Sequence, residues 1–141
     1  MIKHFFRLIL VAILLTACGT DSETGIEVHE VRVDTAAQGE SSELFMEMHN
    51  HGGETDQLTG VSSEAAEGAE LHNGEEIVQD IPVYANSDLE FTPDRYHVVL
   101  VGLKQDLHEG DEIEVVLQFQ DHEDITIHAT VGEAAEHNDD H

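Results

Sequence analysis

Residues 96–119 read YHVVLVGLKQDLHEGDEIEVVLQF and show the clearest secondary-structure pattern in the chain. Its first part, residues 96–101, is an almost unbroken apolar run, which is typical of a strand buried on both faces. Residues 112–119 alternate polar and apolar side chains, the period-two pattern of a strand with one buried face. A connection with glycine at both ends, residues 102–110, separates the two segments. The stretch therefore predicts two β-strands joined by a loop.

The period-two pattern continues on both sides of this stretch. It begins at residues 26–33, where a slip at Glu30 indicates a β-bulge. Met46 and Met48 fall on one face of the next strand, which indicates core packing. Residues 62–68 are rich in Ala, Glu and Ser and predict a short helical turn or a loop. Eight or so short strands with turn signals about every 8–12 residues predict an all-β Greek-key β-sandwich of the immunoglobulin-like type. The expected strands cover residues 26–33, 44–49, 58–61, 69–72, 77–84, 88–91, 96–101, 112–120 and 125–131.

The composition limits the classes of partner. The chain has 141 residues, which suits one domain with short tails. It has 5 Lys and Arg against 31 Asp and Glu, with a formal net charge of -26, and the acids are spread along the whole chain. Such a charge repels nucleic acid, so none is expected as a partner, and it attracts cations. The alternative explanation of the charge is a surface adapted to high salt, where screening relieves the self-repulsion.

The N-terminus has the features of an export signal. Residues 1–17 combine Lys3 and Arg7 with an apolar run that is too short to span a bilayer stably. Leu15-Thr16-Ala17-Cys18 resembles a bacterial lipobox, which predicts cleavage before Cys18 and lipidation of its sulfur. Residues 18–25 then form a polar tether. We therefore expect an extracytoplasmic bacterial protein that is anchored to the cell membrane by lipid; the alternative is an ordinary secretory signal with a chance cysteine.

The cysteine content excludes several kinds of site. Cys18 is the only cysteine, so the chain cannot form an internal disulfide, a dinuclear thiolate copper centre, a zinc ribbon or a redox CxxC pair. The sequence also lacks the Gly-x-Ser-x-Gly, HExxH and phosphate-loop motifs of common enzyme classes, so we do not expect an enzyme.

Three segments carry motifs in a recognisable order. Residues 44–61 contain a strand, an Asn-containing turn and an Asp-x-Leu-x-x-Val motif, whose residues are Asn50, Asp56, Leu58 and Val61. Residues 62–72, SSEAAEGAELH, have the pattern Ser-Ser-x-x-Ala…Glu-Leu-His, and residues 91–119 contain the pattern Pro-x-x-Tyr-His…Leu-x-x-Gly-Asp. In these motifs and their order the chain resembles the periplasmic Cu(A) chaperone family. The likeness runs through residues 26–131.

This resemblance implies a cupredoxin-like β-sandwich over residues 26–132 and a copper site. His72 and His97 fall on the two histidines of the family's copper site. The family also uses Met thioethers, but Val99 stands where one of them is expected, and residues 73–83 contain no Met. The alternative interpretation is that the two residues are ordinary polar histidines near strand ends.

Ligand chemistry decides which ion such a site prefers. Imidazole binds Cu(I), Cu(II) and Zn(II), whereas the soft thioether selects Cu(I). A site without Met selects Cu(I) less strongly over Cu(II) and Zn(II), and a carboxylate ligand such as Glu70 shifts the preference towards Cu(II) or zinc. His49 and His51 are candidate auxiliary ligands, with a solvated turn as the alternative. The tail, residues 133–141, offers His137 and His141 as weak scavengers, with plain solvation as the alternative.

Two functions remain open at this stage. One is a copper metallochaperone that, as the family resemblance implies, delivers copper to a cytochrome c oxidase subunit or to another copper chaperone. The other is a metal-free adaptor, a β-sandwich lipoprotein that has lost the family's site. The absence of the two Met ligands is the feature that favours the adaptor.

Overall fold

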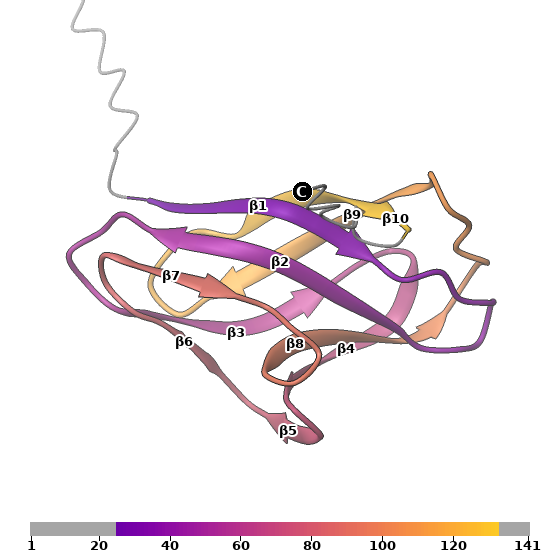
Figure 1. Cartoon of the computed structure of the whole chain (residues 1–141), viewed down its shortest axis with the longest axis horizontal. Helices are drawn as coiled ribbons and strands as arrows, with labels where there is room; N and C mark the ends of the chain where they lie inside the picture. The colour runs from indigo at the N-terminus through magenta and orange to yellow at the C-terminus, as the bar shows by residue number, and fades with distance from the viewer. Residues whose placement is uncertain (1–24, 133–141) are drawn as a thin grey trace, which may run out of the picture.

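A computed structural model describes residues 25–132, and every regular element in this range is a β-strand (Figure 1). The predicted all-β class is confirmed. No helix of the described residues is long and apolar enough to cross a membrane. The predicted signal peptide, Cys18, the tether up to residue 24 and the tail from residue 133 lie outside the described residues. The strands are β1 (Ile26–Val33), β2 (Ser42–Asn50), β3 (Asp56–Ser62), β4 (Ala66–Asn73), β5 (Glu76–Val78), β6 (Ile81–Val83), β7 (Ser87–Glu90), β8 (Tyr96–Leu103), β9 (Glu112–Phe119) and β10 (Ile125–Val131).

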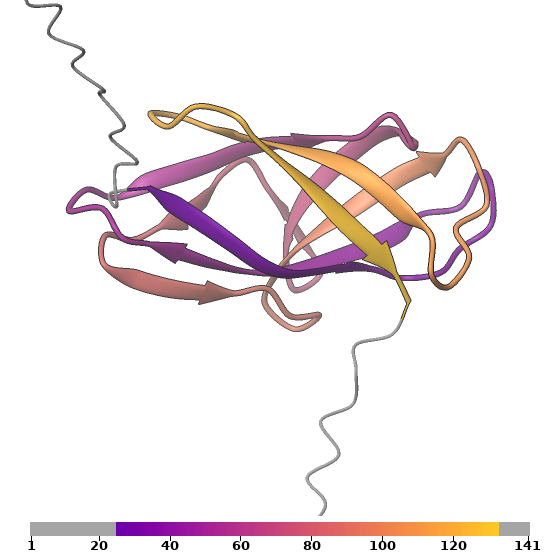
Figure 2. The same ribbon diagram turned by 90° about the horizontal axis from the view of Figure 1, so that it is seen from above.

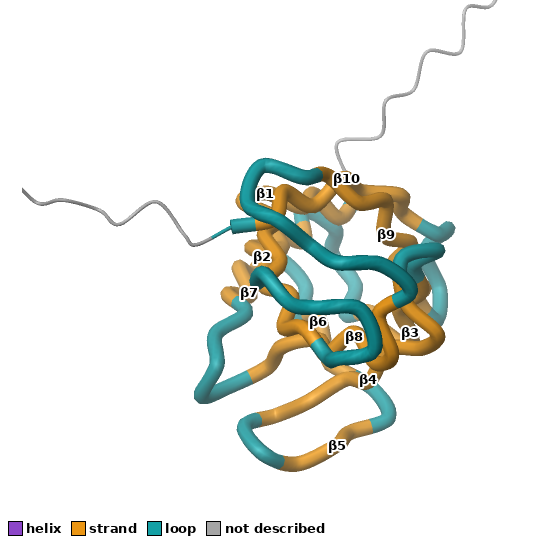
Figure 3. The backbone as a smooth tube through the Cα atoms, turned by 90° about the vertical axis from the view of Figure 1, so that its right-hand side faces the viewer, coloured by secondary structure: helices purple, strands orange, loops and turns teal. Residues whose placement is uncertain are grey.

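The strands form one hydrogen-bonded sheet that curls around the core. Its order is β5-β4-β8-β2-β1-β10-β9-β3-β6, and β7 pairs with β2 beside this path. All pairings are antiparallel except β1 with β10, which join the two ends of the domain. Seen from the end (Figure 3), the strands surround a common interior, and from above (Figure 2) the strands on the two sides cross at an angle. The apolar face of every strand is thereby turned towards one core.

Strand β2 divides the outer surface into two regions. Along one edge it pairs with β1; along the other, its first half pairs with β8 and its second half with β7. Ser42 to Leu44 face Leu100 to Val98, whereas residues 47–50 face β7. One outward face therefore lies over β4, β8 and the start of β2, and another over β1, β7 and the end of β2. Of the histidines in residues 25–132, His72 and His97 lie on the first face, and His29 and His49 lie on the second.

The core follows the alternation seen in the sequence. Met46 and Met48 are 2% and 1% exposed, so their predicted packing role is confirmed. The predicted bulge is confirmed too: the β1–β2 register shifts between His29 and Arg32, and Glu30 has a φ of 51°. Residues 62–68 form no helical turn. A short turn ends at Ala65, and β4 begins at Ala66, because the edge of β8 offers backbone partners along its whole length.

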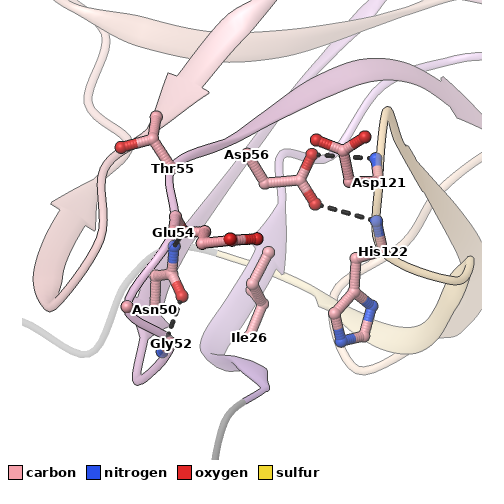
Figure 4. Close-up of a pocket in the computed structure, with 9 residues that line it drawn as sticks. Ile26, Asn50, Gly52, Glu54, Thr55, Asp56, Asp121 and His122 are labelled. Carbon is pink, nitrogen blue, oxygen red and sulfur yellow. Dashed lines mark hydrogen bonds between the residues drawn. The ribbon is translucent and has the colours of Figure 1, made fainter.

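The motif turn after β2 is held by two buried side chains (Figure 4). Asn50, which is 3% exposed, accepts a hydrogen bond from the Gly52 amide through Oδ1 and donates through Nδ2 to two backbone carbonyls, of Glu54 and Val83. Asp56, 7% exposed, accepts from the Gln57 and Asp121 amides through Oδ1 and from the His122 amide through Oδ2. These motif residues therefore satisfy buried backbone groups and join separate loops.

Candidate metal site

His72 and His97 are direct cross-strand partners on β4 and β8. Their ring centroids lie 5.3 Å apart, with an interplanar angle of 36°. Two imidazoles that share one ion, each with a nitrogen about 2 Å from it, have centroids on the order of 5–6 Å apart. The antiparallel register therefore brings the two predicted ligands, which are distant in sequence, within reach of a common ion.

Hydrogen bonds fix the tautomer of His97. Its side chain is 4% exposed, and Nδ1 lies 3.0 Å from the backbone oxygen of Arg95. Because a carbonyl oxygen only accepts, Nδ1 carries the proton and a neutral His97 keeps its lone pair on Nε2. That nitrogen lies 3.6 Å from Oε1 of Glu43. An imidazole oriented by a backbone carbonyl is the usual form of a metal-binding histidine.

His72 is more exposed, at 16% of its side chain, and is paired with a carboxylate. Its Nε2 lies 2.9 Å from Oε2 of Glu70, the residue two positions earlier on the same face of β4. Glu70 is thus placed beside the histidine pair, as the sequence suggested for an auxiliary ligand. A cation bound here has an oxygen donor next to its nitrogen donors.

Val99 occupies the position at which the family resemblance places a Met. It lies between two acidic residues, because β8 pairs Val99 with Glu43 on one side and with Glu70 on the other. The outward face therefore offers two imidazoles and two carboxylates, and no thioether. Sequence reasoning missed Glu43, since only the strand register shows that β2 runs beside β8 at this point.

A buried aromatic ring supports the site from the side of β2. Phe45 is 4% exposed, and its ring centroid lies 6.1 Å from that of His97. The Arg32 guanidinium carbon is 4.7 Å from the Phe45 centroid, the distance of a cation–π contact. This packing holds the His97 ring in place, because the ring has little room to rotate when both neighbours are fixed.

The site opens into a surface pocket of about 450 Å³. Besides the histidines and Glu43, its lining includes Glu75 and Asp94, so the entrance is acidic and attracts cations. Among residues 25–132, no group of three or more His, Cys, Asp or Glu side chains is arranged to hold a metal ion directly. In this pocket the two imidazoles are therefore the nearest pair of nitrogen donors, with the carboxylates of Glu43 and Glu70 beside them.

A tight hairpin positions the edge of this pocket. Asn73 pairs with Glu76, and the turn between β4 and β5 consists of Gly74 and Glu75. Gly74 has a φ of +61°, which suits the first central position of a type II′ turn, where glycine is preferred. Its amide donates to the Arg95 carbonyl over 2.8 Å and so joins the turn to the residues before β8.

His49 and His51 do not reach this site. His49 lies near the far end of β2, on the half that pairs with β7, about 20 Å from Glu43 for a strand rise of roughly 3.3 Å per residue. The two rings instead contact each other, with centroids 3.9 Å apart. They belong to a separate histidine cluster, which consists of His29, His49 and His51 around Glu27. The candidate tail ligands His137 and His141 lie outside the described residues.

The other histidines in the described range lie apart from both clusters. His108 and His128 are exposed, with side-chain exposures of 75% and 61%. His122 is half-buried, and its ring packs edge-on against Phe119. His128 has one carboxylate neighbour, Glu112, at 3.1 Å, which makes it a suitable control for substitutions elsewhere.

The separate cluster lowers the pKa of Glu27. The main cause is a hydrogen bond from His51, followed by one from His29. Oε2 of Glu27 lies 3.0 Å from Nε2 of His51 and 3.2 Å from Nε2 of His29. Both histidines stabilise the ionised carboxylate, so a proton adds to Glu27 only as the pH falls below its ordinary titration range.

We expect His51→Ala to raise the pKa of Glu27 towards its ordinary value, because the largest cause of its shift is then removed. The measurement is a titration of the Glu27 carboxyl carbon by NMR. His128→Ala, which changes a histidine–carboxylate pair elsewhere, should leave the Glu27 titration unchanged. An unaltered Glu27 pKa in His51→Ala would show that the contact does not form in solution.

Comparison with known proteins gives a family for this chain and solved structures with a similar fold. A family model described as "LpqE-like: Putative lipoprotein LpqE-like" matches residues 26–131. The chain belongs to this LpqE-like family. A relative from Leifsonia xyli subsp. xyli (strain CTCB07), "Putative lipoprotein Lxx21020", is 33% identical over 106 residues, covering 69% of this chain and 63% of the relative. The LpqE-like chain thus aligns with less than two thirds of that relative's length.

Solved structures place the LpqE-like chain among PCuAC domains. The apo PCuAC domain from PmoF1 has a TM-score of 0.71 at 20% identity and covers 77% of this chain and 94% of that one. The copper-bound PCuAC domain from PmoF2 has a TM-score of 0.69 at 25% identity, with 75% and 91% covered. The Cu(I) form of DR1885 from Deinococcus radiodurans has a TM-score of 0.61 at 23% identity, with 74% and 77% covered. The resemblance to the periplasmic Cu(A) chaperone family and the cupredoxin-like fold that it implied are therefore confirmed.

Proposed function

We propose that this LpqE-like protein is an extracytoplasmic copper metallochaperone that binds one copper ion between His72 and His97. The observation that carries the proposal is the cross-strand pairing of these two imidazoles, which line an acidic surface pocket. The copper bound by the similar PmoF2 domain supports the choice of metal.

The geometry suits transfer better than permanent storage. Two protein ligands leave coordination positions of a copper ion open, and the pocket admits a ligand from an acceptor protein. The ion can then move by ligand exchange, with each acceptor ligand binding before a histidine leaves. Such a transfer requires no catalytic acid or base.

The donor set predicts a broader metal preference than a site with thioethers. Imidazole binds Cu(I), Cu(II) and Zn(II), and the oxygens of Glu43 and Glu70 add hard donors beside it. Without a thioether, the preference for Cu(I) rests on the low coordination number of the histidine pair. We therefore propose Cu(I) as the main cargo, with Cu(II) and zinc as weaker competitors.

The proposed recipient is a cytochrome c oxidase subunit or another copper chaperone, and the proposed anchor is the lipidated Cys18. The lipoprotein designation of the family and of the Leifsonia relative supports an extracytoplasmic, membrane-anchored location. Anchoring would restrict the search for a membrane-bound acceptor to the membrane surface.

An anaerobic Cu(I) titration against a chromophoric competitor tests the proposal. The sample is the full chain in detergent with His137→Ala and His141→Ala, so that tail histidines do not contribute. We expect one Cu(I) per chain at the His72–His97 site, and a higher affinity for Cu(I) than for Zn(II) at that site. Failure to bind any Cu(I) would overturn the proposal and favour the metal-free adaptor.

A further inference from the structure

A second group of histidines and acids lies on the outward face formed by β1, the end of β2 and β7, which run side by side (Figure 1). The register pairs Glu27 with His49, and His49 with Asp88 across the other edge of β2. His29 lies two positions after Glu27 on the same strand face, and His51 directly follows β2. The sheet therefore gathers three histidines at one place, and the carboxylates of Glu47 and Glu90 line the same pocket as those of Glu27 and Asp88.

One carboxylate oxygen lies between two imidazole nitrogens. Oε2 of Glu27 is 3.0 Å from Nε2 of His51 and 3.2 Å from Nε2 of His29. Two donor atoms of a tetrahedral Zn(II) or Cu(II) site are about 3.3 Å apart when each lies roughly 2.0–2.1 Å from the ion. The two separations that involve Glu27 are therefore close to those between neighbouring ligands of a single ion.

The third histidine has the support typical of a metal ligand. Nδ1 of His49 is hydrogen-bonded to Oδ1 of Asp88, which leaves Nε2 as the ring nitrogen for an ion. A carboxylate bound to the second nitrogen of an imidazole orients the ring and raises its basicity. The His49 ring also contacts the His51 ring, with centroids 3.9 Å apart, so the two histidines can turn towards one ion.

The side chains must move to enclose an ion, since the described residues hold no group of three already arranged around one point. Their exposure permits this: the side chains of His29 and His51 are 59% and 38% exposed, and that of Glu27 is 57% exposed. They line a surface pocket of about 520 Å³, which leaves room for rotation. An ion would replace the protons that Glu27 now shares with its two histidine partners.

We propose that His29, His51 and Glu27, with His49 as a further ligand, form a second metal site that takes a borderline divalent cation, Cu(II) or Zn(II). Imidazole and carboxylate suit these ions, and the one methionine at the pocket, Met48, is buried and 1% exposed. The site is separated from His72 and His97 along β2, so the two load independently. The proposal does not depend on copper binding at the first pair.

The test is a calorimetric titration with Cu(II) and, in a separate experiment, with Zn(II). The sample is the full chain in detergent with His72→Ala, His97→Ala, His137→Ala and His141→Ala, so that the first pair and the tail cannot bind. We expect one divalent ion per chain, an affinity at least 10-fold lower after His51→Ala or His29→Ala, and a similar loss after Glu27→Gln. His128→Ala, which removes an exposed histidine beside Glu112, should leave the affinity unchanged.

Paramagnetic broadening by Cu(II) in amide NMR spectra gives a second readout, and it should centre on β1 and the end of β2. The proposal is overturned if the sample binds neither ion, if His29→Ala and His51→Ala bind as tightly as the parent, or if broadening centres elsewhere. These outcomes leave Cu(I) binding at His72 and His97 untouched, so the two proposals fail separately.

Discussion

His97→Ala is expected to lower the affinity for Cu(I) by about 100-fold or more, because it removes one of two proposed ligands. Loss of a group that only orients a ligand already costs roughly 10–100-fold in metal affinity. His97 is the more sensitive member of the pair, since its ring is 4% exposed and held by the Arg95 carbonyl and by Phe45. The measurement is the anaerobic competition titration, with His29 and His51 replaced by alanine in every sample.

Matched variants separate a ligand from a structural residue. His72→Ala should produce a similar loss, whereas His128→Ala, on an exposed face, should produce none. Because His97 is buried, its variant needs a check of folding by circular dichroism and thermal unfolding. If His72→Ala and His97→Ala both fold and retain parental Cu(I) affinity, the histidine pair is not the copper site.

Restoring the missing thioether with Val99→Met should raise selectivity for Cu(I) over Zn(II).

The strands were predictable from sequence because they depend on local pattern, whereas His72 and His97 were suggested as ligands by the family resemblance. Alternation along β9 and β10 gave the buried faces, and the motif around residues 91–119 placed His97 at the start of a strand. The extended conformation of residues 66–68 was not predicted, because their composition favours a turn. These residues form the start of β4 because they pair with the neighbouring edge of β8. Tertiary pairing outweighs local preference at such positions.

The surroundings of the histidine pair depend on register, which one sequence does not give. Glu43 approaches His97 only because β2 pairs with β8 at its first three residues. The separation of His49 and His51 from the first pair likewise follows from the change of partner along β2. The sequence did contain a signal for the second cluster, because Glu27 and His29 lie two positions apart and therefore on the same face of one strand. Their proximity to His51 required the β1–β2 register.

Asp56→Ala is expected to destabilise the domain by about 3–5 kcal/mol, the largest effect on folding that we predict. The buried carboxylate accepts three backbone hydrogen bonds, from Gln57, Asp121 and His122. A hydrogen bond to a charged group contributes roughly 1.5–3 kcal/mol, and a buried donor left without a partner costs about 1–3 kcal/mol. Because these bonds join the start of β3 to the turn between β9 and β10, truncation loosens contacts that are distant in sequence.

Urea unfolding of the parent and the variants measures this loss of stability. We expect Asp56→Ala to lower the urea concentration at the midpoint without changing the dependence of the unfolding free energy on urea. Asp121→Ala is the matched control, since it removes an exposed carboxylate in the same pocket while its backbone amide still donates to Asp56. It should change stability by less than about 0.5 kcal/mol. Asp56→Asn should fall between the two, because its amide NH2 cannot accept from the backbone amides. An Asp56→Ala variant within 1 kcal/mol of the parent would mean that water replaces the carboxylate, and that the motif aspartate serves something other than the fold.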